Sequence, residues 1–350
     1  MTHRVVQWTT GNVGTKSVQA IAANPLLELV GCYAWSADKV GRDAGELAGI
    51  PALGITATDD VDALLALRPD CVVYNPMFAD VEELIRILAS GANVVTTSEF
   101  ITGDGLGADR ERIVEACLRG DATIFGSGIN PGFMQMLSIV TAGLSDRVDR
   151  ISILESFDTT IYNSPATEKP MGFGYPVDQP DLPAITEKGS WIFREAVLLV
   201  ADALGARLDE VRCDVDYAQT TEDLELPGGW TIGKGCVAGV DVRWQGVIGG
   251  REVIEVRGRW RKGQSLDPDW PMDFGYTVEV QGRPTIRTTL SFEPPPDFRA
   301  ETLDDFVMLG LTITAMPAIT AIPAVVAAPP GIATYTTLPL MLPRGVLSAR

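Results

Sequence analysis

The sequence contains a single histidine, His3, which lies ahead of the first predicted strand. This scarcity argues against histidine-dependent zinc sites and Ser-His-Asp triads, and we expect no resident metal. No C-x-x-C pair occurs among the five cysteines, so we expect reduced thiols in a cytoplasmic protein. The cysteines are Cys32, Cys71, Cys117, Cys213 and Cys236.

Positive charge is also scarce. The chain has 28 lysines and arginines against 46 aspartates and glutamates, which gives a formal net charge of −18. Nucleic acids and anionic membranes are bound through basic surfaces, so we expect neither as a partner. The N-terminal residues MTHRVVQW contain no basic segment followed by an apolar one, which predicts no signal peptide and a cytoplasmic location.

Charge is missing altogether from residues 306–343. Within them, LGLTITAMPAITAIPAVVAA is about long enough to span a bilayer. Pro317, Pro323, the threonines and the lack of a basic N-terminal flank argue against a membrane span. We therefore expect a buried helix at a domain or subunit interface.

The first part of the chain alternates strand-like and helix-like segments. Apolar runs such as RVVQW, LELVGCYAW and CVVY are separated by amphipathic segments such as DVEELIRILASG. This alternation is typical of a Rossmann-type α/β domain with a doubly wound parallel sheet. We expect this dinucleotide-binding domain at residues 1–134.

Longer alternating runs in the second part predict an α+β domain with a mostly antiparallel sheet. We expect this substrate and dimerisation domain at residues 135–300, with a proline- and glycine-rich loop over 163–190 and a hairpin at GVIGGREV. The C-terminal segment, residues 301–350, is expected to pack back on both domains.

The segment WTTGNVGTKSV, residues 8–18, joins the first predicted strand to the first predicted helix. Gly11 and Gly14 have the spacing of the last two glycines of the dinucleotide fingerprint, but Thr9 replaces the first. Backbone N–H groups and the helix dipole favour a diphosphate at such a turn. An ordinary tight corner is the alternative, and the βαβ context favours the cofactor. The expected binding residues are Thr10, Gly11, Asn12, Val13 and Gly14.

The second predicted strand ends in AWSADKVGR, where the adenosine ribose of the cofactor is expected. NAD enzymes usually have an acid at this tip, whereas here Ser36 is followed by Lys39 and Arg42, with Asp38 two residues late. A hydroxyl and two cations suit a 2′-phosphate. We expect NADP(H) as the preferred cofactor and leave NAD(H) open, because solvated loop charges are the alternative for Lys39 and Arg42.

Polar residues follow the fourth and fifth predicted strands, in YNPMF and TTSEF. Parallel strands end at one edge of the sheet, so Asn75, Pro76, Thr97 and Ser98 are expected along the nicotinamide half of the cofactor.

Glu99 is a carboxylate at the end of an otherwise buried strand. Partial desolvation beside a nicotinamide would suit it for acid–base catalysis, and a simple ion pair or turn cap is the alternative. In the loop SGINPGF after the sixth strand, Asn130 is expected to bind the carboxamide, with a plain turn as the alternative.

Four segments occur in order along nearly the whole chain: GNVGTKSV, TTSEF, GINPGF and ITAIPAVVAAPPGI. Together they resemble the dihydrodipicolinate-reductase-like oxidoreductases, and more narrowly the NAD(P)H-dependent amine dehydrogenases, to which 2,4-diaminopentanoate dehydrogenase is related. The resemblance implies reductive amination of small ketones or aldehydes with ammonia, or oxidative deamination in reverse. It also implies that Glu99 matches the acid–base glutamate of the relatives.

The substrate is expected to be small and mostly apolar. True dihydrodipicolinate reductases carry a histidine pair followed by a lysine, and this chain has no histidine beyond His3, so we expect a different activity. The candidate pocket segments are aromatic, apolar and hydroxylic, and their one loop cation, Lys169, is expected to be solvated. The candidate pocket walls are Phe133, Phe157, Tyr162 and Phe173, with core packing as the alternative.

The leading hypothesis is therefore an NAD(P)H-dependent amine dehydrogenase that uses a small carbonyl compound or amine and ammonia. The alternatives are a semialdehyde or diamine dehydrogenase of the same fold, and a non-catalytic NADP(H)-binding sensor. Glu99 argues against the sensor, which has no need of a carboxylate beside the nicotinamide. The exposed antiparallel sheet and the uncharged C-terminal segment predict a homodimer.

Overall fold

The computed structural model describes residues 2–162 and 164–347, and the chain forms two compact units. Unit 1 consists of Met1–Phe133 and Met308–Arg350, and unit 2 of Met134–Val307. Each unit is built around a seven-stranded sheet.

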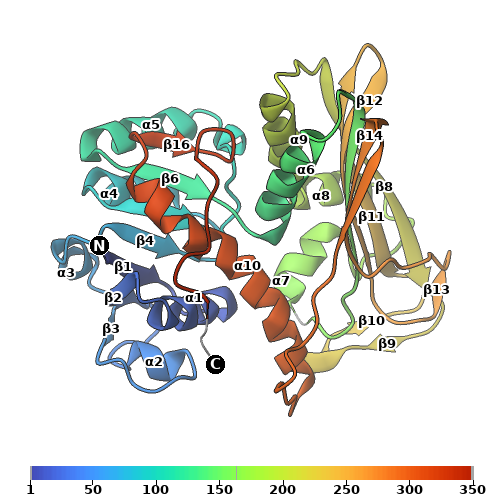
Figure 1. Cartoon of the computed structure of the whole chain (residues 1–350). Coiled ribbons are helices and arrows are strands. Elements are labelled where there is room, and N and C mark those ends of the chain that lie inside the picture. The colour runs from blue at the N-terminus through green and yellow to red at the C-terminus, as the bar shows by residue number, and fades with distance from the viewer. Residues whose placement is uncertain (1, 163, 348–350) are drawn as a thin grey trace. The chain divides into compact units, whose positions relative to one another are not determined.

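The sheet of unit 1 is parallel throughout, in the order β16-β6-β5-β4-β1-β2-β3 (Figure 1). Strand order reverses between β1 and β4, which is the switch point of a doubly wound sheet and confirms the predicted Rossmann-type fold. The strands are β1 (His3–Trp8), β2 (Leu27–Tyr33), β3 (Ala57–Thr58), β4 (Cys71–Tyr74), β5 (Asn93–Thr96), β6 (Thr123–Gly126) and β16 (Gly331–Ala333).

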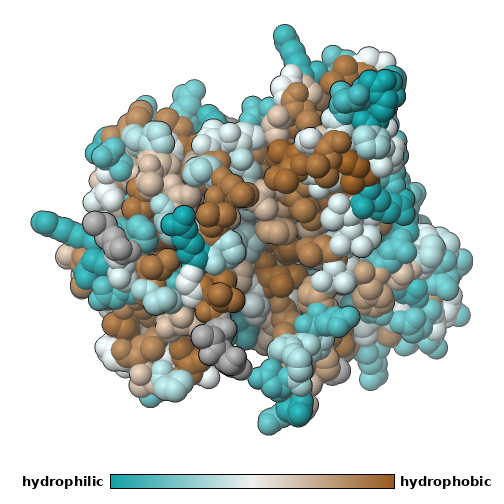
Figure 2. Space-filling model, viewed as in Figure 1, coloured by the Kyte–Doolittle hydropathy of each residue, from teal (hydrophilic) through white to brown (hydrophobic). Residues whose placement is uncertain are grey.

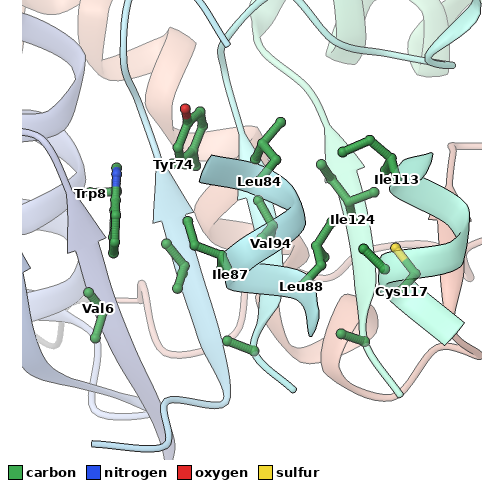
Figure 3. Packing of buried hydrophobic residues seen from close by; sticks show 14 of the residues in the cluster. Val6, Trp8, Tyr74, Leu84, Ile87, Leu88, Val94, Ile113, Cys117 and Ile124 are labelled. Carbon is green, nitrogen blue, oxygen red and sulfur yellow. The ribbon is translucent and has the colours of Figure 1, made fainter. Parts of the chain in front are cut away.

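Alternate residues of these strands pack on opposite faces of the sheet. Val6, Trp8 and Tyr74 lie on the face covered by α4 and α5, whose apolar residues Figure 3 shows packed against them. Val5 and Val73 lie on the other face, with α1 and α10. The helices are α1 (Asn12–Ala23), α2 (Ala44–Leu47), α3 (Val61–Ala66), α4 (Val81–Ala89), α5 (Asp109–Gly120) and α10 (Leu303–Val326).

The uncharged segment, residues 306–343, forms most of α10 and adds to the core of unit 1. Its residues Ala318, Ile322 and Val325 are buried against the sheet. Within the described residues α10 is the one helix whose length and apolar composition would suit a membrane span, over Asp305–Val326, and its buried face belongs to this core. Strand β16, which follows it and pairs with β6, was not predicted from the sequence.

The sheet of unit 2 has the order β13-β8-β11-β12-β7-β14-β15. All neighbours are antiparallel except β12 and β7, which confirms the prediction of a mostly antiparallel sheet. Gly249 and Gly250 both have positive φ, at 57° and 74°, in the predicted hairpin between β11 and β12. The strands are β7 (Arg147–Asp158), β8 (Glu210–Thr220), β11 (Val237–Ile248), β12 (Arg251–Arg261), β13 (Leu266–Asp267), β14 (Gly275–Arg283) and β15 (Ile286–Leu290), and β9 (Leu224–Glu225) pairs separately with β10 (Thr231–Ile232).

Helices lie against one face of this sheet. Phe193 stacks on Trp260 with 5.9 Å between ring centroids, and the indole of Trp244 donates to the Ser190 hydroxyl at 2.9 Å. On the other face, Asp241 is buried beneath the guanidinium groups of Arg257 and Arg259. The helices are α6 (Met134–Ala142), α7 (Pro165–Glu168), α8 (Leu182–Gly189) and α9 (Ile192–Ala203).

The prediction of one long loop over 163–190 was wrong. It contains α7, a short 3-10 turn at Lys169–Met171, and α8, while Asn163 lies outside the described residues. Pro165 and Pro183 stand in the first turns of α7 and α8, where a missing N–H donor does not matter. Prolines that suggest a loop in the sequence therefore mark helix starts here.

Candidate cofactor and active site

The turn between β1 and α1 is closely packed. Thr9 adopts a left-handed conformation with φ 70°, and its carbonyl accepts a hydrogen bond from Gln7 Nε2 at 2.9 Å. A Cβ on Gly14 would lie 2.4 Å from the Thr9 oxygen, whereas one on Gly11 would meet no atom within 4 Å. Gly14 is therefore needed for packing inside the turn, and the space beside Gly11 is open.

The start of α1 differs from the starts of the next three helices. Asp43, Asp60 and Asp80 cap α2, α3 and α4 through their carboxylates, but α1 begins after Gly11, which has no side chain to offer. The first N–H groups of a helix need acceptors and carry its positive dipole end. An anion such as a diphosphate fits this position.

Buried hydroxyl groups lie in the same turn. Neither Thr9 Oγ1 nor Thr10 Oγ1 has a hydrogen-bond partner within the described part of the chain. Unpartnered buried polar atoms are uncommon, and they are consistent with a site that a ligand completes.

The loop after β2 contacts this turn. Lys39 Nζ donates to the Thr10 carbonyl at 3.0 Å, which places the ammonium beside the start of α1. The Ser36 hydroxyl bonds to the Asp38 carboxylate and is the main reason that the pKa of Asp38 lies below its ordinary value. Arg42 is exposed, and so is Trp35, next to Ser36.

Asn75 and Thr97 lie side by side where β4 and β5 end. Asn75 Nδ2 donates to Thr97 Oγ1 at 2.8 Å, and Asn75 Oδ1 accepts from Gln7 Nε2 at 2.9 Å. The Ser98 hydroxyl donates to the Pro76 carbonyl at 2.5 Å and so joins the loops after the two strands.

Glu99 and Asn130 follow β5 and β6 and lie at the same edge of the sheet. Glu99 is half-buried in a bend between buried Ser98 and Phe100, and Asn130 is half-buried in the irregular turn Ile129–Phe133. In that turn Gly132 has φ 133°, and a Cβ there would lie 2.7 Å from the Ser127 hydroxyl. Every cofactor residue predicted from the sequence thus lies at the carboxyl edge of the unit 1 sheet, as does Glu99; their binding roles stay predictions.

Of the four candidate pocket walls, Phe133 is half-buried in unit 1 and the other three belong to unit 2. Phe157 and Tyr162 are half-buried, and Phe157 packs edge-on against Tyr276 with 5.1 Å between centroids. Phe173 is buried, and its ring lies 5.6 Å from the Lys262 ammonium.

Lys262 stabilises the segment that contains Tyr162. It is fully buried, pairs with Glu168 Oε1 at 2.6 Å, and donates to the carbonyls of Thr159 and Tyr162 at 2.7 and 3.0 Å. Burial lowers the pKa of Lys262 and raises that of Glu168, while the charge of each partner opposes the shift. Lys169, by contrast, is exposed, as predicted.

Sequence reasoning missed Gln7 and Lys262. Gln7 is fully buried in β1, and a polar residue inside the apolar run RVVQW is a signal that pointed to it. Lys262 follows the charged stretch RGRWR, so no local pattern distinguished it from a solvated lysine.

The parallel sheet, its switch point beside a glycine turn, the open space at Gly11 and the unpartnered hydroxyls fit a nicotinamide dinucleotide. In the described ranges, 2–162 and 164–347, no group of three His, Cys, Asp or Glu side chains could hold a metal ion. The fold and the site define an NAD(P)-dependent oxidoreductase.

Comparisons with known proteins narrow this class. The family described as "2,4-diaminopentanoate dehydrogenase C-terminal domain" matches residues 133–349. An amine dehydrogenase from Streptomyces virginiae is 32% identical over 306 residues, which are 81% of this chain and 84% of that protein. The chain therefore belongs to the family of 2,4-diaminopentanoate dehydrogenases and amine dehydrogenases, and the resemblance found in its sequence is confirmed.

Two further matches concern the whole fold and a short part of the sequence. The structure of an amine dehydrogenase from Mycobacterium smegmatis matches with a TM-score of 0.80 at 20% identity, covering 98% of each chain, so the fold is shared. A 4-hydroxy-tetrahydrodipicolinate reductase from Synechococcus elongatus is 35% identical over 85 residues, only 20% of this chain and 31% of that protein.

Proposed function

We propose that this protein is an NAD(P)H-dependent amine dehydrogenase that reductively aminates a small, mostly apolar ketone or aldehyde with ammonia, and deaminates the amine in reverse. The position of Glu99 carries the proposal, because this carboxylate lies at the same sheet edge as the glycine turn. Family membership supports the amine chemistry. The proposal includes the roles of residues 1–134 in binding the dinucleotide, of 135–300 in binding the substrate, and of 301–350 in packing on both.

The reaction needs one acid–base group from the protein. A bound nicotinamide cofactor supplies the hydride that reduces the imine carbon. As a carboxylate, Glu99 takes a proton from ammonium, and the resulting ammonia attacks the carbonyl carbon. The added nitrogen passes a proton to the carbonyl oxygen and so gives a hydroxyl. As an acid, Glu99 then returns its own proton to this hydroxyl, which leaves as water and gives the iminium ion. Phe133, Phe157 and Tyr162 would wall the substrate, with Phe173 packed behind the loop.

The decisive experiment measures NADPH consumption with cyclohexanone and with a short aldehyde, each with and without ammonium. We expect ammonium-dependent oxidation in the wild type and a loss of at least about a hundredfold in Glu99→Gln. Tight NADPH binding by Glu99→Gln serves as the control for folding. Binding without turnover across a broad carbonyl panel would support the sensor instead, and turnover of semialdehydes or diamines alone would support the second enzyme.

NADPH is proposed as the preferred cofactor, with NADH as a weaker one. Lys39 beside the turn and exposed Arg42 support this choice, whereas Asp38 on the same loop would repel a 2′-phosphate. We expect Lys39→Ala and Arg42→Ala to lower kcat/KM for NADPH about tenfold each and for NADH much less. Steady-state kinetics with both cofactors test this, and a wild-type preference for NADH would contradict it.

A cytoplasmic homodimer is the proposed form of the protein. The open face of the unit 2 sheet and the uncharged C-terminal segment are the surfaces put forward for the interface. Apolar residues also reach the surface around α6, where Val140 is 59% and Leu144 70% exposed. Figure 2 shows a brown, hydrophobic area over the part of unit 2 in which Figure 1 labels α6. Exposed apolar patches of this kind favour association.

A further inference from the structure

A polar network runs through the otherwise apolar core beside the glycine turn. Gln7, Asn75 and Thr97 follow Val5, Val73 and Val95 at a spacing of two, so all three continue the α1-side face of neighbouring strands. Gln7 and Ser17 are fully buried and Asn75 is 8% exposed. Polar groups at such depth are retained only when their hydrogen bonds are specific.

The direction of the Gln7 amide is set by the backbone. Gln7 Nε2 lies 3.2 Å from the Trp8 carbonyl oxygen and 2.9 Å from that of Thr9. Carbonyl oxygens only accept hydrogen bonds, so the atom facing them is the nitrogen. The contact at 2.9 Å also holds the carbonyl of Thr9 in place. Thr9 stands where the fingerprint has its first glycine, and it adopts the positive φ that glycine would adopt easily.

The direction of Asn75 follows from that of Gln7. Asn75 must present its oxygen to Gln7 Nε2 at 2.9 Å, and this oxygen also lies 3.1 Å from the Ser17 hydroxyl. Asn75 Nδ2 then faces Thr97 Oγ1 at 2.8 Å and donates to it. A flipped Asn75 would set two NH₂ groups against each other.

Thr97 stands at the end of this chain of bonds. Because its oxygen accepts from Asn75, its single proton is available to another acceptor, and no protein acceptor for it is found among residues 2–162 and 164–347. We propose that Gln7, through Asn75, is a positioning residue that fixes Thr97 as a hydrogen-bond donor to an oxygen of the nicotinamide–ribose half of the cofactor. This inference rests on the proposed function, and it goes further by making one buried amide orient both the diphosphate turn and the nicotinamide end.

Four variants separate these roles. Thr97→Val removes the donor and Thr97→Ser restores it. Asn75→Asp puts an oxygen against Thr97, so the Thr97 proton turns inward. Gln7→Leu removes the amide that holds both Thr9 and Asn75. Thermal melting of each variant identifies any that fails to fold.

The measurements are dissociation constants for NADPH and for ADP, which lacks both the nicotinamide–ribose half and the 2′-phosphate. We expect Thr97→Val and Asn75→Asp each to weaken NADPH about fivefold to tenfold while leaving ADP unchanged, and Thr97→Ser to match the wild type. Gln7→Leu is expected to weaken both ligands. In the Thr97→Val background, Asn75→Asp is expected to cause no further loss, because it acts through the hydroxyl already removed.

Two outcomes overturn the inference while leaving the proposed function standing. One is a Thr97→Val protein that binds NADPH like the wild type, and the other is a full effect of Asn75→Asp in the Thr97→Val background. A wild type that binds neither NADPH nor NADH overturns the proposed function and this inference with it.

Discussion

Gly11 and Gly14 stand three residues apart in one turn, yet they meet different surroundings. A methyl group on Gly14 would collide with the Thr9 carbonyl at 2.4 Å and crowd Gln7 Nε2 at 3.1 Å. Gly11 has an ordinary φ of −74° and open space at its Cβ position. Gly14 is therefore needed to form the turn itself, whereas a side chain at Gly11 would project into open space.

Alanine is expected to lower mainly the stability of the protein at position 14 and mainly its affinity for NADPH at position 11. Gly14→Ala should lower the free energy of unfolding by about 1–3 kcal/mol, because the turn must shift to admit the methyl group. Gly11→Ala should lower it by less than about 1 kcal/mol but weaken NADPH at least about tenfold, since the methyl group would project where the diphosphate is proposed to lie. Thermal unfolding and fluorescence titration measure the two effects. If Gly11→Ala binds NADPH as tightly as the wild type, the proposal that the diphosphate lies beside Gly11 is contradicted.

Thr9 shows what a motif can and cannot predict. It stands where the fingerprint has its first glycine, and it adopts positive φ, which is rare for threonine. The contact that supports it comes from Gln7, and the Thr9 N–H also donates to the Tyr33 carbonyl on the next strand. The turn could be predicted from local spacing, whereas its support depends on side-chain contacts that spacing does not contain.

At the scale of whole elements, strands buried on both faces were predictable, as in CVVY of β4. Among the elements that were not predicted from the sequence, β16 and α7 lack such a signal. β16 is the three-residue run GIA, and α7 starts with a proline inside a glycine-rich stretch. Both are held by contacts distant in sequence, such as the Thr123 hydroxyl to the Pro329 carbonyl at 2.8 Å.

The open face of the unit 2 sheet is organised around one buried carboxylate. Asp241 on β11 is 3% exposed at its side chain, and Arg257 and Arg259 on β12 bond to it at 2.6 and 2.7 Å. Burial by itself raises the pKa of Asp241, but the hydrogen bonds and charges of the two arginines outweigh it and hold the pKa below its ordinary value of 3.8. The ionised carboxylate therefore stabilises the folded sheet at every pH above that value.

Asp241→Asn is expected to lower the free energy of unfolding by about 3 kcal/mol at neutral pH, because it leaves guanidinium groups without their buried counter-charge. The difference from the wild type should shrink as pH falls below about 4, because Asp241 is then protonated in the unfolded chain first and in the folded protein only at lower pH. Denaturant unfolding at several pH values measures it. Asp216→Asn is the control, since Asp216 is 64% exposed in its pair with Arg243 and should change stability by less than about 1 kcal/mol. If the difference for Asp241→Asn does not depend on pH, the ionised carboxylate of Asp241 is not what stabilises the sheet.

At the scale of the whole molecule, the chain leaves unit 1 after Phe133 and returns to it at Met308. The returning segment buries Ile322 and Val325 in the core that contains Val5 and Val73, and it adds β16 at the edge of the sheet beside β6. The sequence predicted the change of domain through a change in local pattern. The packing of the C-terminal segment was predicted from its lack of charge. A lack of charge indicates that the segment is buried, but it does not indicate which strand the segment packs against.

The proposed homodimer makes a claim about the open sheet face that charge reversal can test. Arg287 on β15 is 68% exposed and pairs with Glu279 on β14, on the same face as Asp241. Light scattering is expected to give twice the chain mass of 37.5 kDa for the wild type. Arg287→Glu places a second carboxylate beside Glu279 and so adds negative charge to this face. If this face is the interface, the measured mass should shift toward that of one chain.

Arg86→Glu is the matched control for that variant. Arg86 on α4 of unit 1 is 48% exposed and paired with Asp62, so its reversal carries the same change of net charge at a surface not proposed for the interface. Its mass should remain that of the wild type. Equal dissociation of both variants would assign the effect to net charge, since a chain already at −18 gains further repulsion from either substitution. A wild type that is monomeric at all accessible concentrations would remove the dimer, and the open face would then need no partner because its arginines are already neutralised within the chain.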